Sequence, residues 1–330
     1  MAREQIHTIA LDELYRSIAP DVARAEQIFR DELESDQPFI NELCQHVAQY
    51  HGKRVRPALV LLSGQACGVL KPAHHVLAAV VEMVHIATLV HDDVLDEADI
   101  RRRVATVNRL WGNERAVLLG DYLISHAFHL CSSLDSQYAS RLIGRTTNTV
   151  CEGEMMQCAN RDNFDLSEAG YFDIITRKTA VLLGVCCRLG ARYAGADESV
   201  CARMDLFGES LGVAFQIVDD LIDLLGDEAE AGKSLGRDVE KGKLTLPLIH
   251  YLRTARDDER AAMLTLLRAD DPQRYRQIAR LLQQSESIDY AQDAAFRRIN
   301  QALQALGELP PGDAKSSLTA MAEFVLIRRH

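Results

Sequence analysis

Two short acidic motifs of the form Asp-Asp-x-x-Asp are the part of this sequence best suited to chemistry. Their members are Asp92, Asp93 and Asp96, followed far along the chain by Asp219, Asp220 and Asp223. In each motif the aspartates stand at i, i+1 and i+4, so on a helix the first and last share one face and the middle one lies about 100° away. Carboxylates at the end of an apolar helix oppose the helix dipole and lose hydration, so a cation has to compensate them.

Magnesium is the cation that this arrangement favours, because it prefers oxygen ligands, keeps some of its waters and bridges carboxylates to substrate phosphates. One such motif alone is as often a solvated acidic helix end as a metal site. Here the segment from Ala87 to Asp96 is echoed by the segment from Ala214 to Asp223, and an apolar run precedes each motif. The sequence therefore predicts Mg²⁺ ions held by two motifs that face each other across a bundle of helices.

Basic residues stand near these motifs in an otherwise acidic chain. Lys and Arg suit phosphate oxygens because they form charge-assisted hydrogen bonds with them. A single basic cluster is more often a solvated surface feature, but repeated association with the acidic motifs favours a phosphate site. The candidates are Lys53, Arg54 and Arg56, then Arg101, Arg102 and Arg103, and later Lys178, Lys233 and Lys243.

His85 lies seven residues before Asp92, about two helical turns, and so shares its face of the helix. A lone buried histidine is usually a satisfied core residue, whereas this position beside the expected pocket favours a phosphate contact. His85 also completes a Glu82-x-x-His85 unit, which is the ligand pattern of a di-iron helical bundle. That fold needs two such units, and the sequence contains no second one.

Composition favours a helical protein with a large core. The chain has 330 residues, of which 47% are hydrophobic and only 6% aromatic, and it is rich in good helix formers. Its formal net charge of −11 argues against nucleic acid as a partner, because no overall excess of cations is available for the phosphates.

Helical periodicity extends along most of the chain, strand-like alternation is absent, and no convincing linker interrupts it. We therefore expect one helical domain over residues 1–330, with an N-terminal extension over about residues 1–20. The run from Val76 to Val90 is apolar around most of its circumference, which predicts a central buried helix. The other expected helices span 21–50, 55–67, 114–133, 139–160, 167–189, 198–225, 244–253, 272–284, 290–306 and 314–327.

The eight cysteines lack Cys-x-x-Cys spacing and mostly lie in apolar runs, which is typical of reduced core residues in a cytoplasmic protein. The N-terminal residues contain acids and no sustained apolar run, so no secretory signal is expected. Apolar stretches are broken by charge before the roughly 20 residues that a membrane span needs. The sequence thus predicts a cytoplasmic protein without a membrane span.

Taken together, these motifs resemble the trans-prenyl diphosphate synthase family, most closely its long-chain, octaprenyl-type members. The resemblance covers Asp21 to His250, and it implies an all-α isoprenoid synthase fold, a single large helical bundle with a central cavity, and a homodimer. The motifs that carry it are Gly52-Lys53-x-x-Arg56-Pro57, His85 to Arg102, Glu152-Gly153-Glu154, Lys178-Thr179, Phe215-Gln216-x-x-Asp219-Asp220-x-x-Asp223, Gly232-Lys233 and Gly242-Lys243.

The resemblance also implies roles for particular residues, set out here by substrate. Isopentenyl diphosphate would be held by Lys53, Arg56, His85 and Arg102. The allylic diphosphate would be held or flanked by Arg101, Lys178, Thr179, Gln216 and Lys233, with Lys243 as a second contact. About three Mg²⁺ ions would be bound with substrate by Asp92, Asp93, Asp96, Asp219, Asp220 and Asp223.

The implied reaction is ionisation of the allylic diphosphate, attack by the double bond of isopentenyl diphosphate, and loss of a proton. Val84, Ala87 and Thr88 precede the first motif on the same helix, and none is aromatic. They leave room for a growing tail, so we expect a medium-to-long product. The number of isoprene units, the preferred allylic primer and the downstream pathway stay open.

Other functions remain open beside this one. A short-chain, geranylgeranyl-type synthase would differ only in product length, a class I terpene cyclase would share the acidic motif without a second diphosphate site, and a non-catalytic partner subunit would bind without turnover. The sequence departs from the family at two positions usually held by glycine, where it has His51 and Arg103. If the backbone at Arg103 has positive φ, a side chain there adds strain.

Overall fold

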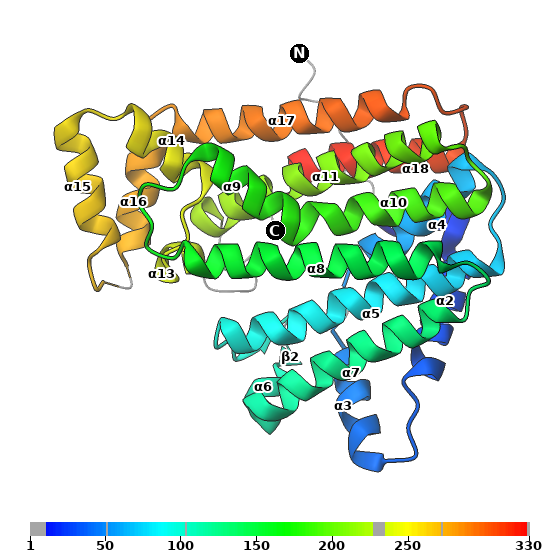
Figure 1. Cartoon of the computed structure of the whole chain (residues 1–330). Coiled ribbons are helices and arrows are strands. Elements are labelled where there is room, and N and C mark those ends of the chain that lie inside the picture. The colour runs from blue at the N-terminus through cyan, green and yellow to red at the C-terminus, as the bar shows by residue number, and fades with distance from the viewer. Residues whose placement is uncertain (1–10, 51, 103, 227–234, 272, 329–330) are drawn as a thin grey trace. The chain divides into compact units, whose positions relative to one another are not determined.

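Helices account for nearly all regular structure in the chain (Figure 1). The computed structural model describes residues 11–50, 52–102, 104–226, 235–271 and 273–328. Within these ranges the only strands are β1 (Ile100–Arg101) and β2 (Val104–Ala105), which pair antiparallel. The all-α class expected from the sequence is confirmed.

The chain divides into two compact units. Unit 1 comprises Met1–Thr147, Leu182–Gly208 and Leu306–Ala320, and unit 2 comprises Asn148–Val181, Glu209–Ala305 and Met321–His330. The expectations of a single domain with an N-terminal extension, and of a central cavity, stay predictions.

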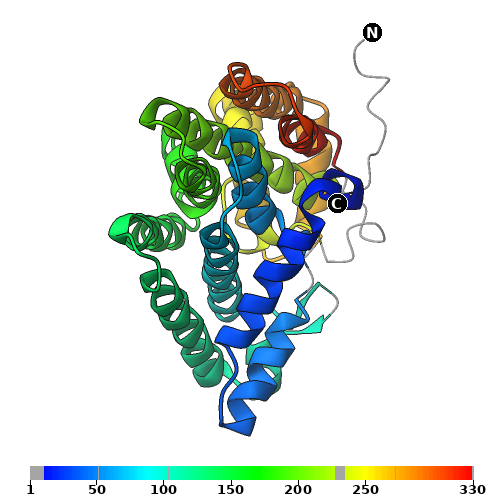
Figure 2. The ribbon, with the colours of Figure 1, turned by 90° about the vertical axis from the view of Figure 1, so that its right-hand side faces the viewer.

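Unit 1 is arranged around α5 (Pro72–Leu95), which contacts α2, α4 and α7 and lies between α2 and α7 in Figure 2. It further contains parts of α8 (Gln137–Ala159), α10 (Val181–Ala194), α11 (Glu198–Leu225), α17 (Ser287–Leu306) and α18 (Asp313–Ile327). Its remaining helices are α1 (Leu11–Leu14), η1 (Arg16–Ile18), α2 (Ala19–Glu32), α3 (Pro38–Ala48), α4 (Val55–Cys67), α6 (Val107–Trp111) and α7 (Asn113–Ser132).

The apolar run that predicted a central buried helix forms α5, and that prediction is confirmed. Pro72 occupies its first turn, where the missing N–H costs no hydrogen bond, and Leu77 through Val81 are at most 1% exposed. Among the described helices, α5 is the one long and apolar enough to cross a membrane by length and composition. Because 67% of that stretch is buried, as in the core helix of a globular protein, this is weak evidence for a span.

The expected helix over 21–50 is two helices, because the chain turns between Leu33 and Gln37. Pro38 starts α3, and the side chain of Asn41 closes the turn by accepting a hydrogen bond from the Ser35 N–H at 2.9 Å. A proline favours a helix start because its φ is already helical. Both flanking segments have helical periodicity, so the sequence pattern did not reveal the break between them.

The expected helix over 167–189 is divided, and its first part lies in unit 2. The segment begins as α9 (Glu168–Ile175), passes through a π-helical turn, η2 (Thr176–Ala180), and continues into α10. Such π turns are rare and often stand at functional sites. The other helices of this unit are α13 (Arg237–Glu240), α14 (Leu246–Thr254), α15 (Asp257–Leu267), α16 (Arg274–Gln283) and parts of α8, α11, α17 and α18.

Several elements were not expected from the sequence. Among the helices, α6 is short, and α15 buries only Met263 and Leu267, so its apolar periodicity is weak. The expectation that the chain has no strands is wrong at β1 and β2, where Ile100 pairs with Ala105 and Arg101 with Val104. Two-residue strands are too short to show alternation.

Candidate functional site

The first acidic motif closes α5 in unit 1. Asp92 and Asp93 lie in the last turn, and Asp96 caps the helix through its backbone N–H, which donates to the Asp92 carbonyl at 2.8 Å. Asp92 and Asp96 are half-buried, whereas Asp93 is only 1% exposed. The motif therefore presents its first and last carboxylates outward and its middle one inward.

The β1–β2 hairpin brings a cation back to this motif. The Nε of Arg101 donates to Asp93 Oδ1 at 2.7 Å. The backbone of Arg102 has a φ of +50°, and its guanidinium donates to the carbonyl of Tyr50 at 2.8 Å. A Cβ on Gly52 would collide with that guanidinium, so the glycine is what lets Arg102 lie against the chain there.

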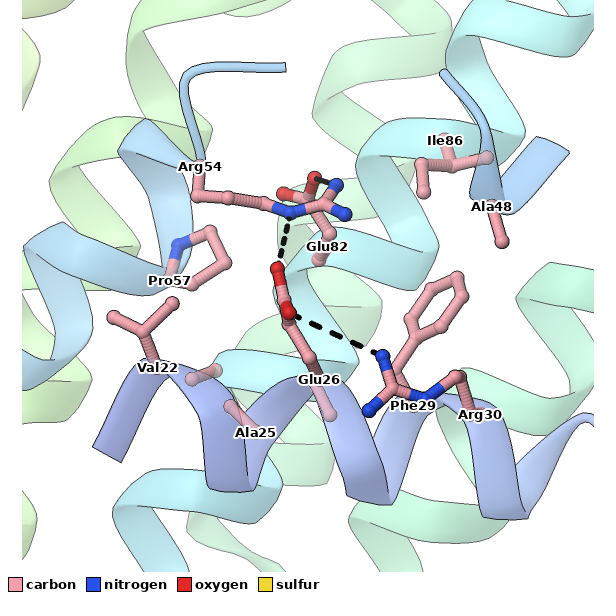
Figure 3. Close-up of a pocket in the computed structure, with 12 residues that line it drawn as sticks. Val22, Ala25, Glu26, Phe29, Arg30, Ala48, Arg54, Pro57, Glu82 and Ile86 are labelled. Carbon is pink, nitrogen blue, oxygen red and sulfur yellow. Dashed lines mark hydrogen bonds and ion pairs between the residues drawn. The ribbon is translucent and has the colours of Figure 1, made fainter. Parts of the chain in front are cut away.

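Arg54 is held in a strained conformation by two acids (Figure 3). It precedes α4 with a φ of +48°, in the left-handed region that costs energy for a residue other than glycine. Its Nε donates to Glu26 at 2.8 Å, and its Nη1 donates to Glu82, a buried carboxylate, at 3.0 Å. These ion pairs fix the backbone between Lys53 and Arg56.

Positive charge exceeds negative charge around Glu82. Burial lowers the pKa of the Arg56 guanidinium, and burial with nearby Arg56 and Arg101 also lowers the pKa of Arg102, although Glu82 opposes both shifts. Glu82 is itself paired with Arg54. Arg56 and Arg102 therefore both depend on Glu82 for negative charge, and a bound anion would stabilise this arrangement.

His85 stands in this cationic surrounding as a neutral imidazole. Burial, and then the charges of Arg56 and Arg102, hold the pKa of His85 well below its ordinary value. Among the described residues, neither its Nδ1 nor the Nε of Arg56 has a hydrogen-bond partner. Buried polar atoms are nearly always paired in proteins, so these two groups are suited to an acceptor such as a phosphate oxygen.

The neutral state of His85 predicts a pH effect on stability. A histidine with a lowered native pKa is protonated first in the unfolded chain, so its contribution is present above about pH 6.5 and is lost as the pH falls. We expect His85→Asn to reduce the loss of unfolding free energy between pH 6.5 and 5.5 by about 1 kcal/mol. Denaturant unfolding at both pH values measures this effect.

His91→Asn is the matched control, because it removes a half-buried imidazole from the same helix. Equal pH slopes in the wild-type protein and in His85→Asn would contradict the assignment of a neutral His85.

A separate pocket of about 140 Å³ lies beside Arg54 (Figure 3). Glu26, Arg30, Arg54 and Glu82 supply its polar groups, and the rest of its lining is apolar. The apolar lining residues are Val22, Ala25, Phe29, Ala48, Pro57, Ala78, Ala79 and Ile86. Of the residues predicted to bind substrate or metal, Arg54 alone lines it, and Arg54 is already paired there with Glu26 and Glu82, so this pocket is not the site that the motifs indicate.

The second acidic motif lies on α11 in unit 2. Asp219 is half-buried and accepts a hydrogen bond from Arg328 at 3.1 Å. The guanidinium of Arg328 also lies over the ring of Phe215, 4.3 Å from its centroid. A cation from the C-terminal end of the chain therefore lies against the outward carboxylate of this motif.

The middle aspartate of the second motif is buried and engaged on both oxygens. Asp220 accepts from the Tyr171 hydroxyl at 2.7 Å and from the Gln216 amide at 2.8 Å. The amide oxygen of Gln216 accepts in turn from the Thr179 hydroxyl at 3.0 Å. Burial, and then nearby Asp238, raises the pKa of Asp220 well above its ordinary value. The four side chains form one continuous network.

This network predicts a stability effect at Tyr171. Removing its hydroxyl leaves one oxygen of a buried carboxyl group without its donor, so Tyr171→Phe should lower the unfolding free energy by about 1–3 kcal/mol. Chemical denaturation measures it. Tyr290→Phe is the control, because the Tyr290 hydroxyl donates to Glu168, a partly exposed acid that water can solvate. Similar losses in both variants would contradict a special role for Tyr171.

The remaining candidates of unit 2 are held by hydrogen bonds and an ion pair. Asp223 is buried and accepts from the Asp238 N–H at 3.0 Å. Lys178 lies in the π turn and contacts Gln157 at 2.9 Å and Glu154 at 2.5 Å. A Cβ on Gly153 would collide with the Lys178 backbone, which explains the glycine between the two glutamates of that motif.

Lys243 and the residues predicted to affect product length also lie in described segments. The Lys243 N–H donates to the Asp238 carbonyl at 2.8 Å, directly after Gly242, whose φ of +66° favours glycine. In unit 1, Val84 and Ala87 are at most 1% exposed, and Thr88 is half-buried with its hydroxyl donating to the His85 carbonyl. The predictions for Lys233, His51 and Arg103 lie outside the described residues.

Unit 1 brings together Arg56, His85 and Arg102, and unit 2 brings together Thr179, Gln216 and Asp220. That the two acidic motifs face each other stays a prediction. Sequence reasoning missed Tyr171, Glu26 and Arg328. Tyr171 stands seven residues before Lys178, about two turns, and that spacing was the one available signal.

The cysteines bear out the expectation in part. All eight are free, and Cys44, Cys131, Cys186, Cys187 and Cys201 are buried. The expectation of core residues is wrong for Cys151 and Cys158, which are exposed on α8.

Comparison with known proteins yields consistent matches. The sequence model of the polyprenyl synthetase family matches residues 37–284. The octaprenyl diphosphate synthase of Haemophilus influenzae is 32% identical over 98% of this chain and 98% of its own length.

Two solved structures are similar over nearly the whole chain. A decaprenyl diphosphate synthase from Rhodobacter capsulatus has a TM-score of 0.92 at 33% identity, covering 97% of this chain and 100% of its own. A polyprenyl synthase from Caulobacter crescentus CB15, complexed with calcium and isoprenyl diphosphate, has a TM-score of 0.92 at 32% identity, covering 97% and 98%. The expected isoprenoid synthase type of fold is confirmed by this likeness.

Proposed function

The chain belongs to the polyprenyl synthetase family, and from that premise we propose that it is a trans-polyprenyl diphosphate synthase. It adds isopentenyl diphosphate units head to tail to an allylic diphosphate and releases a medium-to-long all-trans product of octaprenyl type. The observation that carries this proposal is the cluster of Arg56, Arg102 and neutral His85 in unit 1. Its excess positive charge and unpaired buried nitrogens match the needs of a diphosphate.

Isopentenyl diphosphate binds to this cluster. Arg56 and Arg102 supply charge-assisted hydrogen bonds, and neutral His85 supplies one further N–H without adding repulsion. Lys53 extends the same segment. Arg54 does not touch the substrate in this proposal; it positions Lys53 and Arg56 through its ion pairs with Glu26 and Glu82.

The allylic diphosphate binds through basic and polar groups of both acidic regions. Arg101 pairs with Asp93, and Lys178 and Thr179 lie in the π turn. Thr179 is tied to Gln216, so the network that ends at Tyr171 sets the position of both side chains. Lys233 and Lys243 are proposed as further contacts.

Divalent metal ions, Mg²⁺ in the cell, fit the outward carboxylates. Asp92, Asp96 and Asp219 are half-buried hard oxygen donors, which is the ligand type that Mg²⁺ prefers. About three ions are proposed with substrate bound, as suits a diphosphate bridged to several carboxylates. Bound metal supplies Lewis-acid neutralisation of the departing diphosphate.

The buried aspartates have a different role in this proposal. Asp93, Asp220 and Asp223 accept hydrogen bonds from the protein itself. They position Arg101, Gln216 and the segment before Lys243. All six aspartates thus take part in the proposed metal site: three contact the metal ions, and three position the residues around them.

The chain's own residues carry out the remaining steps of the reaction. The basic groups stabilise the charge that develops on the leaving diphosphate, which lowers the barrier to ionisation. The double bond of isopentenyl diphosphate then attacks the allylic cation, and a proton leaves the product. Water has to be excluded during these steps, because it would capture the cation.

Product length is proposed to depend on the face of α5 that precedes Asp92. Thr88 lies one turn before Asp92, and its hydroxyl is satisfied within α5 itself. We expect Thr88→Phe to shorten the products, because an aromatic ring there obstructs the growing tail. Thr88→Val keeps the volume and should leave the product length unchanged. Thin-layer separation of the dephosphorylated products measures both variants, and unchanged lengths in Thr88→Phe would contradict this assignment.

We further propose a homodimer in the cytoplasm. Leu110, Val117 and Leu118 on α6 and α7 are large apolar side chains with at least 42% of their surface exposed, which supports a contact between protein chains there. Size-exclusion chromatography with light scattering tests the dimer, and cell fractionation tests the location.

One incubation tests the proposed function. Purified protein is given Mg²⁺, radiolabelled isopentenyl diphosphate, and farnesyl or geranylgeranyl diphosphate, and the products are sized. The expected result is incorporation of label into products longer than the primer by several units. Products that stop at the geranylgeranyl length indicate a short-chain synthase. Absence of incorporation from farnesyl diphosphate by the protein alone indicates a cyclase or a non-catalytic subunit.

A further inference from the structure

A carboxylate at the end of α2 lacks a permanent positive partner. Glu32 is the last residue of α2, and its side chain is only 15% exposed. In the part of the chain that the structure describes, its side-chain partners are two histidines and no lysine or arginine. Because a helix ends in unpaired carbonyl groups with negative charge, this position favours a cation.

The two histidines direct the same atom at the same oxygen. His126 and His129 stand three residues apart on α7, so they share one face of the helix. Their Nδ1 atoms lie 2.9 and 2.8 Å from Oε1 of Glu32. The ring of Tyr122, one turn earlier, lies 4.3 Å from that of His126 and restricts its orientation. The three donor atoms lie within 4.8 Å of one another.

From this geometry we propose that Glu32, His126 and His129 bind a divalent transition-metal ion, with zinc as the ion that the donors suit best. Two imidazole nitrogens and one carboxylate oxygen are common zinc ligands, at roughly 2.0–2.2 Å each, and they leave a fourth position for water. Small rotations of the two rings bring both nitrogens to that distance from one ion, because they already converge on one oxygen.

This site differs in chemistry and place from the magnesium site of the proposed reaction. Imidazole ligands select zinc, copper or nickel, whereas Mg²⁺ prefers oxygen donors alone. All three residues belong to unit 1, on α2 and α7, and none belongs to an acidic motif. The ion links the end of α2 to α7, two helices that both contact α5. The inference therefore does not depend on the proposed function.

Zinc binding in the presence of excess Mg²⁺ tests the site. Titration against a chromophoric zinc chelator should show one zinc ion per chain whose affinity falls by about 10-fold or more in His126→Asn and in His129→Asn. Cobalt(II) should give the visible absorption of a site with nitrogen ligands in the wild-type protein, and lose it in the variants. Prenyl transfer with Mg²⁺ should be unchanged in both.

His75→Asn is the matched control. His75 contacts Asp21 at 2.7 Å, so it is also a histidine paired with a carboxylate, but without a second imidazole. Zinc affinity equal to the wild type in this variant supports the site. Equal zinc affinity in the wild-type protein and in His126→Asn would overturn the proposal, because any zinc bound would then sit elsewhere, for example at exposed Cys151 or Cys158.

Discussion

Replacing Asp92 with asparagine should lower kcat for prenyl transfer by about 10²- to 10³-fold, and replacing Asp219 should do the same. Both side chains are half-buried, so the amide fits in place of the carboxylate without leaving a cavity. In the proposed site, the variant removes a charged ligand from the metal ions that would stabilise the leaving diphosphate, which accounts for the expected loss. Steady-state kinetics with saturating substrates measure it.

The same variants should also weaken metal binding directly. Calorimetric titration of Mg²⁺ in the presence of inorganic pyrophosphate should show lower affinity in Asp92→Asn and Asp219→Asn. Asp135→Asn is the matched control, since Asp135 is an exposed acid in the loop after α7. Wild-type kcat in either motif variant, with a folded protein by thermal melting, would refute the metal role of that aspartate.

Asp93→Asn should behave differently from Asp92→Asn. Asp93 is buried and paired with Arg101, so its replacement leaves the guanidinium with a weaker partner. This variant should lose unfolding free energy as well as activity, whereas Asp92→Asn should lose activity alone. The contrast separates a residue that positions a cation from one that contacts metal.

Arg56→Gln is expected to raise the KM for isopentenyl diphosphate by about 30- to 100-fold while changing the KM of the allylic substrate little. Arg102→Gln should have a similar effect, because both guanidinium groups belong to the cluster around Glu82. Direct titration with isopentenyl diphosphate separates binding from turnover. A matched rise in both KM values would contradict the assignment of this cluster to one substrate.

Although Arg56→Gln should weaken binding of isopentenyl diphosphate, it should not destabilise the folded protein. Burial lowers the pKa of Arg56, which means that its charged form is disfavoured in the folded protein. Removing the charge should therefore leave the melting temperature of the substrate-free protein unchanged or higher. Arg141→Gln serves as the control for both measurements, because Arg141 is an exposed residue on α8 of unit 1.

The helical class could be predicted because it depends on local patterns. The apolar run before Asp92 predicted a buried helix, and α5 forms over Pro72–Leu95. The elements that were missed depend on few residues. Strands β1 and β2 have two residues each, and the break before Pro38 lies between two segments of equal periodicity.

The division of labour within the motifs could not be predicted from spacing. A pattern of i, i+1 and i+4 places the middle aspartate on another face, but it does not say which face is buried. Packing decides this: Asp93 turns inward to Arg101, and Asp220 turns inward to Tyr171 and Gln216. The partners Tyr171 and Asp220 are 49 residues apart in the chain.

The sequence by itself determined which residue types were available and where helices could form, because periodicity and hard oxygen donors are properties of short segments. The tertiary structure alone decided which charged groups are buried and paired and which are accessible to a ligand. Arg54 is held in a left-handed conformation by Glu26 and Glu82, and His85 is neutral among guanidinium groups. Both facts arise from burial and from charges brought together by folding, and neither is written in the spacing of the residues.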